Sequence, residues 1–565
     1  MTDPSQCRTM SRRSTTVLRV AALVLVVLTL LAYVAYLLVY VSYAVELFRW
    51  PHDYDQGEGF ELYDAILYSR GEWPYRENST FPYYASNYPP LFHLLMVPLL
   101  PFFGQRLIAG RLLSFSATLV TAGAIAVMVR KTIQGGQRDW MRDWFIPGVS
   151  GLAFLASNYV YQIGPLCRMH MTLVMFETLS VAFIANFDDP QHGTRNLILG
   201  IVMLFCAGYT KQTAVFTVLA VLAFVILRDV KRALLAGAAL AVAAGTVFWM
   251  INVATDGQWW INIIQANVNE FDYRQTLFLF RQWFGLHALF AILGAAYLVY
   301  ELFWDRLSAY SLWFFFALGV GALSGKWGAG FGYFNTAVAA ACVTSGLALG
   351  KLRRRFERQA AVESRSRTSG PRLRPYLAVL IPMLYLIQAP RMLHLPTAGP
   401  AFSTVAQALG VDDQLAYGQG ESLVPTHCAP VAYHDAMGYT QLGHPLSPED
   451  YAAGERIMAY VRATDGPIFS EEAMFSILAD KPVVTNPTQL LNLYNNGMLA
   501  TDEIIEDIDQ QRYDLVIFRA QFYPGPVLEA IGQSYEPMEQ VCMNGFTYHL
   551  LSPRQRSENG SDSSG

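Results

Sequence analysis

The stretch from Asp53 to Pro90 reads DYDQGEGFELYDAILYSRGEWPYRENSTFPYYASNYPP and separates two apolar parts of the chain. The first long apolar run stops at about Ala44, and apolar residues resume at Leu91. The first dozen residues of the stretch include five acids, namely Asp53, Asp55, Glu58, Glu61 and Asp64. Aromatic residues and prolines fill its second half. We therefore expect the rest of the chain to hold this acidic, aromatic-rich loop at one surface of a membrane.

The composition also favours a polytopic membrane protein. Of 565 residues, 53% are hydrophobic and only 15% are charged, whereas soluble domains have roughly 25% charged residues. The mean hydropathy is +0.27. The net charge of −4 does not suggest a nucleic-acid partner. The six cysteines form no C-x-x-C pair, so a disulfide scaffold or a cysteine metal site is not indicated.

Runs of about 20 apolar residues can cross a bilayer as helices. We count about eleven candidate spans, at 17–44, 107–129, 144–163, 169–187, 196–210, 212–227, 233–252, 285–303, 308–325, 334–350 and 375–393. The first span is too long for a signal-peptide core and no A-x-A-like site follows it, which predicts a retained anchor. The run from Leu91 to Gly104 is too short to cross, so we expect an amphipathic or re-entrant helix in the outer interface.

The positive charges orient the spans. Lys and Arg concentrate in the cytoplasmic loops of membrane proteins, and here they cluster before the first span, after the second and sixth, and over 351–374. With eleven spans, all of these clusters fall on the cytoplasmic side. We therefore predict a multi-pass protein of the cell membrane with residues 1–16 in the cytoplasm, a transmembrane part over 17–394, and a first outer loop over 45–106.

Residues 395–553 differ from the apolar part of the chain. Their charges balance, and the short alternations PIFSEEAMFSIL, KPVVT and YDLVIFR predict strands between helices. We predict a small extracytoplasmic α/β domain over 395–553 and a disordered tail over 554–565. Cys428 and Cys542 lie in this domain, where a disulfide is chemically permitted. Two free buried cysteines are an equal alternative.

Several polar residues lie on the predicted outer side, at or near the ends of spans. Ionisable groups near hydrocarbon are costly and usually face a polar cavity, which makes each a site candidate. The candidates are Asp55, Glu58, Arg168, His170, Lys211, Lys326 and Tyr333, with Arg76, Tyr88 and Asn269 in the loops. Simpler roles are also open: Lys211 can snorkel to the interface, Arg168 can flank a span, and His170 can donate a structural hydrogen bond. Most of the acids can be solvated or cap a helix.

The set suits an anionic lipid head group with a general base beside it. Transfer of a sugar from a lipid phosphate needs a carboxylate that takes the proton of the attacking hydroxyl. It also needs cations where charge builds on the departing phosphate. Asp55 fits the first role, and Arg168, Lys211 and Lys326 fit the second. No set of ligands argues for a metal, so we predict metal-independent chemistry; a divalent ion beside Asp55 and Glu58 is the alternative.

Four local patterns follow one another along the chain. The first pattern lies in the acidic loop and consists of Asp55-Gln56-Gly57, Gly71, Pro74-Tyr75-Arg76 and Pro89-Pro90-Leu91. The other three are Arg168-Met169-His170, Lys211 to Ala214, and Gly325 to Phe334. In this order, and on one side of the membrane, they resemble the motifs of membrane-embedded glycosyltransferases of the C-type fold. The likeness is greatest to bacterial relatives of the protein O-mannosyltransferases (glycosyltransferase family 39) and to the lipid A aminoarabinose transferases.

This resemblance covers roughly residues 15 to 395 and implies a mainly α-helical fold. It also implies inverting transfer of a sugar from a polyprenyl-phosphate donor to a glycan, lipid or protein acceptor at the outer face. Asp55 becomes the catalytic carboxylate, and Lys211 with Arg168 handles the lipid phosphate. Gln56 stands where the family usually has an acid; either Glu58 supplies the second carboxylate or no second carboxylate is needed. We assign His170, Lys326 and Tyr333 to donor binding as well, and Arg76, Tyr88 and Asn269 to the acceptor side or the loop. His170 departs from the family, in which an aspartate is common at this position.

Two other classes of protein remain as alternatives. A transporter or flippase of lipid-linked sugars should show paired broken helices in two repeated halves near the midplane. This chain instead concentrates its polar groups at one surface, which disfavours transport. An inactive membrane scaffold whose outer domain binds cell-wall material is the third possibility. The substitution Asp55→Asn separates these classes because it should abolish only transfer.

Overall fold

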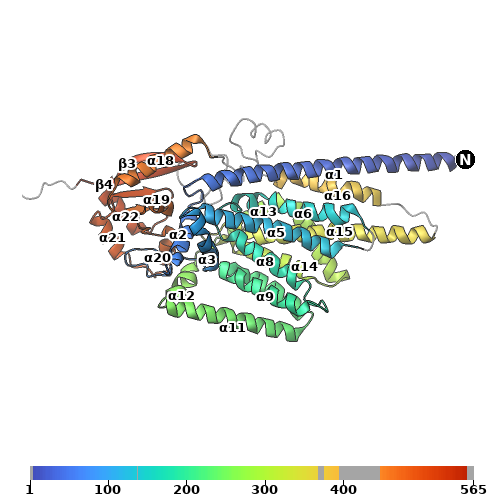
Figure 1. Cartoon of the computed structure of the whole chain (residues 1–565), viewed down its shortest axis with the longest axis horizontal. Coiled ribbons are helices and arrows are strands. Elements are labelled where there is room, and N and C mark those ends of the chain that lie inside the picture. The colour runs from blue at the N-terminus through green and yellow to red at the C-terminus, as the bar shows by residue number, and fades with distance from the viewer. Residues whose placement is uncertain (1–3, 136–137, 367–373, 393–445, 556–565) are drawn as a thin grey trace, which may run out of the picture.

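The computed structural model describes residues 4–135, 138–366, 374–392 and 446–555. Figure 1 shows an elongated helical bundle with the N-terminus at one end and a smaller α/β unit at the other. The protein is therefore a mainly α-helical, multi-pass membrane protein with a small C-terminal sheet, as the sequence predicts. Residues 393–445 and 556–565 lie outside the described part. Cys428 and most of the expected tail therefore also lie outside it.

The bundle begins with one very long helix and contains helices of unequal length. Its helices are α1 (Pro4–Arg49), α2 (Glu58–Ser69), α3 (Leu91–Met96), α4 (Leu100–Phe103), α5 (Ile108–Ile133), α6 (Ile146–Leu155), α7 (Asn158–Ile163), α8 (His170–Ile184), α9 (Gly193–Thr210), α10 (Val215–Ile226), α11 (Val230–Ala254), α12 (Gln258–Ile263), α13 (Tyr273–Trp304), α14 (Ala309–Ala322), α15 (Asn335–Ser366) and α16 (Arg374–Met392).

Each of the eleven expected spans overlaps a helix of this bundle. Among the described residues, six helices are long and apolar enough to cross a membrane, and they lie in α1, α5, α9, α11, α13 and α15. The helices α8, α10 and α14 are apolar but shorter. The count of eleven spans therefore stays a prediction.

The helix α15 forms the centre of the bundle. It contacts α5, α6, α8, α13, α14 and α16. Of the most apolar 18 residues within Phe331–Glu357, 83% are buried, against 11% for the corresponding stretch of α11 at the periphery. Its small residues Ala337 to Ala341 are all buried. Small side chains let helix backbones approach closely. In a membrane this close packing holds helices together, because no hydrophobic driving force acts between them.

Two expected spans depart from single straight helices. The run 144–163 is divided between α6 and α7, because Ser157 adopts an extended conformation (φ −65°, ψ 127°). The run 285–303 belongs to α13, which already starts at Tyr273 and is interrupted at His287. Nε2 of His287 lies 2.8 Å from Oγ of Ser157. The two helix interruptions therefore lie next to each other, and the side chains of Ser157 and His287 form a hydrogen bond inside the bundle.

The C-terminal unit combines short helices with one mixed sheet. Its elements are α18 (Pro448–Ala463), β1 (Ile468–Ser470), α19 (Ala473–Leu478), α20 (Pro487–Asn495), α21 (Asp502–Asp509), β2 (Leu515–Phe518), α22 (Gly525–Ser534), β3 (Tyr535–Met543) and β4 (Phe546–Pro553). The strand order is β1-β2-β4-β3. β1 and β2 are parallel, with Ile468 opposite Leu515, and the other two pairings are antiparallel.

Two details of this sheet differ from the sequence expectation. KPVVT (481–485) is not a strand; it forms only an isolated bridge, in which Thr485 pairs with Tyr83 of the first outer loop. The hairpin β3–β4, which we did not expect, turns at Asn544 and Gly545, whose φ angles are 51° and 70°. An Asn-Gly pair suits this turn because both central residues need positive φ.

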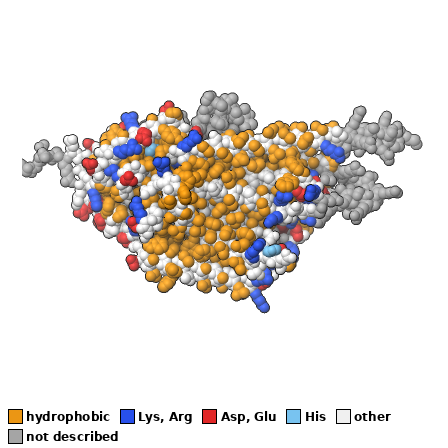
Figure 2. All heavy atoms as spheres, in the orientation of Figure 1, with side chains coloured by type: hydrophobic (Ala, Val, Ile, Leu, Met, Phe, Trp, Pro, Cys, Tyr) orange, Lys and Arg blue, Asp and Glu red, His pale blue; other side chains and the backbone are white. Residues whose placement is uncertain are grey.

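The C-terminal unit packs directly on the first outer loop. The Asp53 carboxylate accepts a hydrogen bond from the Met474 backbone at 3.2 Å, and the Tyr83 hydroxyl donates to Asp507 at 2.7 Å. The helix α19 also contacts α2. The loop is therefore held between the bundle and the C-terminal unit, which explains why α2 is buried on most sides. Figure 2 shows hydrophobic side chains covering the bundle between charged groups at its two ends.

Candidate active site

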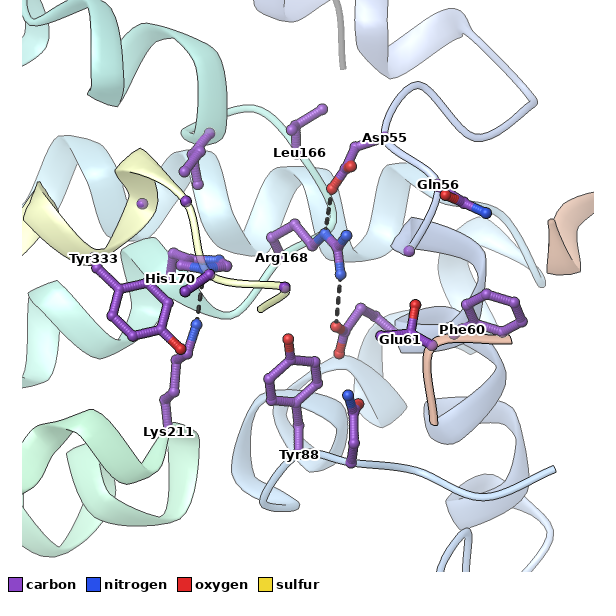
Figure 3. Close-up of a pocket in the computed structure, with 18 of the residues that line it drawn as sticks. Asp55, Gln56, Phe60, Glu61, Tyr88, Leu166, Arg168, His170, Lys211 and Tyr333 are labelled. Atoms are coloured by element: carbon purple, nitrogen blue, oxygen red, sulfur yellow. Dashed lines mark hydrogen bonds and ion pairs between the residues drawn. The ribbon is translucent and has the colours of Figure 1, made fainter. Parts of the chain in front are cut away.

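A cavity lies where α2, the turns before α8 and after α9, and the segment before α15 meet the C-terminal unit (Figure 3). Its volume is about 150 Å³ and it is partly open to solvent. The polar residues that line it are Asp55, Gln56, Glu61, Asn87, Tyr88, Arg168, His170, Lys211, Tyr333, Asn486 and Thr488. Backbone of the glycine-rich segment 328–332 forms part of one wall.

Arg168 lies between two carboxylates of the cavity (Figure 3). Its Nε donates to Oδ2 of Asp55 at 2.5 Å, and its Nη1 lies 3.3 Å from Oε1 of Glu61. Although burial opposes the charged form, Asp55 and Glu61 raise the pKa of Arg168 well above its usual range. The Asp55 side chain keeps 11% of its surface exposed. Among the described residues nothing donates to its Oδ1, so this oxygen is available to a ligand.

Lys211 faces Arg168 across the cavity and has different partners. It follows α9 in an extended conformation (φ −159°, ψ 141°), which turns its side chain inward. Its Nζ lies 2.9 Å from Nε2 of His170 and 5.0 and 5.5 Å from the rings of Tyr333 and Tyr88. An ammonium only donates, so Nε2 of His170 accepts and the imidazole is neutral.

Lys211 has no carboxylate within ion-pair distance among the described residues, and Glu61 favours its charge only from farther away. Burial together with Arg168 lowers the pKa of Lys211 to about 7. Arg168, by contrast, is already paired with two acids. The cavity can therefore accept an anion at Lys211 while Asp55 remains a charged base on the other side.

Glu58 does not line this cavity. Its side chain is fully buried and forms a bidentate pair with Arg111, at 2.9 and 2.8 Å. It also accepts hydrogen bonds from the backbone of Tyr54 and Cys167. Although burial favours the neutral form, Arg111 lowers the pKa of Glu58. These contacts saturate the carboxylate and point to a structural role.

The other predicted site residues are divided between the cavity and its surroundings. Tyr88 lines the cavity with its ring, together with His170 and Tyr333. Lys326 does not line it, but it lies close enough to lower the pKa of Lys211, and its own pKa is lowered by burial. Arg76 pairs with Glu72 at the surface, and Asn269 donates to the Trp327 backbone at 2.9 Å. Neither lines the cavity.

Sequence reasoning missed Glu61, Asn486 and Thr488. Glu61 stands one helical turn after Glu58, so the helix start in this acid-rich stretch contained the signal for it. Asn486 caps α20 and also donates to the Ala85 backbone at 3.1 Å. Nothing in the local sequence around Asn486 and Thr488 indicates that the C-terminal unit reaches the cavity.

The metal and disulfide predictions remain open. Among the described residues, no group of three or more His, Cys, Asp or Glu side chains could hold a metal ion; metal independence stays a prediction. Cys542 lies in β3. Its proposed partner Cys428 lies outside the described residues, so the pairing is also still a prediction.

Comparison with known proteins gives likeness in structure only. No family model matches the sequence, and no curated protein matches it. The fold is similar to that of ArnT from Cupriavidus metallidurans in the apo state (TM-score 0.55, 14% identity) and bound to undecaprenyl phosphate (TM-score 0.57, 13% identity). Each comparison covers 92% of this chain and 97% of ArnT.

The apo oligosaccharyltransferase of Archaeoglobus fulgidus also matches, with a TM-score of 0.49, 13% identity, and coverage of 90% of this chain and 73% of that chain. The two ArnT structures show that the chain shares the fold of a membrane glycosyltransferase. The resemblance to the lipid A aminoarabinose transferases is thereby confirmed at the level of the fold. The more specific likeness to glycosyltransferase family 39 stays a prediction.

Proposed function

We propose that this protein is a membrane glycosyltransferase that moves a sugar from a polyprenyl-phosphate carrier to an acceptor at the outer face of the membrane. One observation carries the proposal: a single cavity holds both Asp55 and Lys211. Within the part of the chain that the structure describes, one oxygen of Asp55 accepts no hydrogen bond and Lys211 has no carboxylate within ion-pair distance. The ArnT structure that matches in fold is bound to undecaprenyl phosphate, which supports a lipid phosphate as the ligand of this cavity.

The cavity suits a single displacement with inversion. An acceptor hydroxyl attacks the anomeric carbon, its proton moves to Oδ1 of Asp55, and the bond from the anomeric carbon to the phosphate oxygen breaks. The electron pair of that bond leaves with the lipid phosphate. Lys211 stabilises the charge that develops there. Arg168 orients Asp55 through the 2.5 Å hydrogen bond, and Tyr88 and Tyr333 flank the ammonium.

We infer an orientation for the molecule from its lipid donor and its loop charges. The donor lipid keeps its tail in the bilayer, which requires the cavity to lie at a membrane surface, and the cation-rich loops favour the outer surface for the cavity and the C-terminal unit. We place residues 1–16 in the cytoplasm, 17–394 as the transmembrane transferase part with its outer loop over 45–106, and 395–553 outside. The cation-rich inner loops agree with this placement.

A transfer assay on purified protein in lipid tests the proposal. Wild type and Asp55→Asn would be offered a panel of radiolabelled polyprenyl-phosphate sugars. Wild type should release label from at least one carrier. Asp55→Asn should lower the transfer rate by at least about 100-fold, because a positioned general base contributes about 10²–10⁴-fold.

The matched control is Asp480→Asn, since Asp480 is exposed in the C-terminal unit and Asn tolerates its positive φ of 53°. This variant should transfer at the wild-type rate. Equal transfer by wild type and Asp55→Asn would reject Asp55 as the base. If the folded protein binds donors but turns over none of them, a lipid carrier or scaffold role is favoured instead.

A further inference from the structure

A chain of buried ionisable side chains leads away from the cavity behind Glu61. Oε2 of Glu61 lies 2.6 Å from Nε2 of His93, and Oδ2 of Asp64 lies 3.6 Å from the same nitrogen. The Tyr84 hydroxyl closes the chain by donating to Asp64 at 2.7 Å. His93 is fully buried, and the side chains of Glu61 and Asp64 expose only 3% and 4%. Neither His93 nor Asp64 takes part in the transfer described above.

The charges of this chain do not balance without an extra proton. Among the described residues, Arg168 is the one permanent cation within ion-pair distance of the carboxylates of Asp55, Glu61 and Asp64. Arg519 acts on Asp55 and Lys211 acts on Glu61 only from farther away, and Arg519 is already paired with Glu472. Burying a carboxylate without a counter-charge is very unfavourable. The remaining charge can be reduced by a proton on either His93 or Asp64, the two groups farthest from the cavity. Either location leaves Glu61 ionised next to Arg168.

We propose that His93 and Asp64 form a proton-holding pair that keeps Glu61 ionised, and that Glu61 thereby fixes Arg168 against Asp55. His93 is then a positioning residue for the transfer step. This inference rests on the proposed function only for its kinetic consequences. The charge balance itself is a property of the folded protein.

The groups around His93 support this assignment. Burial opposes the charged imidazole, but Asp64 and Glu61 together raise the pKa of His93 above its usual value. Burial also raises the pKa of Asp64 to about 6. The elements packed against α3 are α2, α5 and α9. Their other titratable or charged side chains near this end are Glu58, Tyr63 and Tyr68 on α2, Arg111 on α5, and Cys206 and Tyr209 on α9, none of which shifts the pKa of His93.

Charge rescue distinguishes this role from simple packing. His93→Gln keeps a donor for Glu61 but cannot hold the proton, so kcat at saturating donor should fall by about 10- to 100-fold through misplacement of Arg168. Adding Asp64→Asn removes the carboxylate that the proton balanced. The double variant should therefore recover about 3-fold or more of kcat relative to His93→Gln. A structural role predicts the opposite, because two buried contacts are lost instead of one.

The pH profile supplies a second kinetic readout. In wild type, kcat at saturating donor should fall as the pH rises through the titration of the pair, because the deprotonated pair no longer balances Glu61. The double variant has no such pair and should lose this alkaline decline. The matched control is His287→Gln, another buried histidine in the bundle, which should keep the wild-type profile. A double variant no better than His93→Gln, or an unchanged kcat in His93→Gln, would overturn the proposal.

A measurement without turnover separates this inference from the proposed function. Deuterium exchange at the imidazole C2 of His93, followed by mass spectrometry across pH, reports its titration in the intact protein. The pKa of His93 should lie above the ordinary histidine value of about 6.5 and should fall in Asp64→Asn. A pKa of His93 at or below 6.5 in wild type that does not change in Asp64→Asn would reject the proton-holding pair, even if the protein is an active transferase. The expected titration in a protein without transfer would leave the pair in place and reject the proposed function alone.

Discussion

The buried position of Lys211 beside Arg168 sets how its charge responds to pH. Burial and the neighbouring Arg168 lower its pKa to about 7 in the free protein. An anion bound at Nζ favours the charged form, so the pKa of Lys211 is higher in the complex. Between these two values the free protein loses the proton and the complex keeps it. Binding of an anionic lipid phosphate is therefore linked to proton uptake.

We predict that the affinity for undecaprenyl phosphate falls as the pH rises above about 7, by at most about tenfold per pH unit. Lys211→Arg keeps a charge that does not titrate, so it should show only the pH dependence of the phosphate itself. Lys211→Met should lose about 2 kcal/mol or more of binding free energy at pH 6. Binding of radiolabelled undecaprenyl phosphate between pH 6 and 9 gives all three curves. Parallel curves for wild type and Lys211→Arg would contradict the assignment.

Glu58 has the opposite character, because its partners are all within the protein. Replacing one member of a buried ion pair leaves a buried charge without a partner, at a cost of about 3–5 kcal/mol. Glu58→Gln should therefore lower the thermal unfolding midpoint strongly, since Arg111 is fully buried beside it. Glu72→Gln, which breaks an exposed pair with Arg76 in the same loop, should cost no more than about 1 kcal/mol. Unchanged stability with lost transfer in Glu58→Gln would restore Glu58 to the chemistry.

These residues also show how far a sequence can predict the site. Asp55, Arg168, His170, Lys211 and Tyr333 could be found because polar residues at the ends of apolar runs need a polar environment. The choice between Glu58 and Glu61 could not be made, since both lie in the first turn of α2. It depends on Arg111, which is 53 residues away along the chain and occupies Glu58 completely.

At the level of single elements, the start of α2 is the most constrained place in the site. Gly57 precedes the helix, and a Cβ built on it would overlap the guanidinium of Arg168. Because the overlapping atoms are the far end of a long side chain, Arg168 can move away at little cost in stability. The close approach of backbone and guanidinium therefore positions Arg168 between its two carboxylates.

We predict that Gly57→Ala reduces transfer by about 100-fold, as expected for a displacement of about 1 Å in the site, while the unfolding midpoint changes little. The matched control is Gly123→Ala, because a Cβ at Gly123 on α5 meets nothing within 4 Å. It should leave both transfer and stability unchanged. Wild-type transfer by Gly57→Ala would show that the position of Arg168 is not critical.

Elements were predictable where their signals are local. The apolar runs marked the helices of the bundle, and the Asn544-Gly545 turn marks a hairpin that the sequence contains and that we did not identify. The extended run KPVVT was assigned to the sheet because its alternation suits a strand, but Thr485 pairs with Tyr83 in the outer loop instead. Such a choice between partners is made by tertiary contacts, which no local pattern contains.

On the scale of the whole molecule, the C-terminal unit forms one wall of the cavity. It contributes Asn486 and Thr488 to the lining and is attached to the loop through the buried hydrogen bond from Tyr83 to Asp507. Hydrogen bonds to charged groups contribute about 1.5–3 kcal/mol. The fold of each part followed from composition and periodicity, whereas their docking depends on contacts between residues about 400 positions apart.

We predict that Tyr83→Phe loosens this attachment by about 1.5–3 kcal/mol, because the buried Asp507 carboxylate loses the hydrogen bond at 2.7 Å that joins it to the outer loop. Amide hydrogen exchange should then speed up at the 83–86 segment and at α21, with less change inside the bundle. Tyr494→Phe is the control, since the Tyr494 hydroxyl donates no hydrogen bond to any of the described residues. Equal exchange in the two variants would mean that this bond does not hold the unit in place.

The hydrogen bond between Asp53 and the Met474 backbone joins two parts of the chain that are synthesised at very different times. In the orientation proposed above, the acidic loop leaves the ribosome right after the first anchor, whereas Met474 is translated more than 400 residues later and crosses the membrane only after the last span is inserted. Until then the loop has its carboxylates but lacks the C-terminal unit. Under the proposed function, we expect a nascent or C-terminally truncated chain to have an open site and the full chain to become competent only after translocation. The order of the sequence would then keep incomplete chains from consuming lipid-linked sugar.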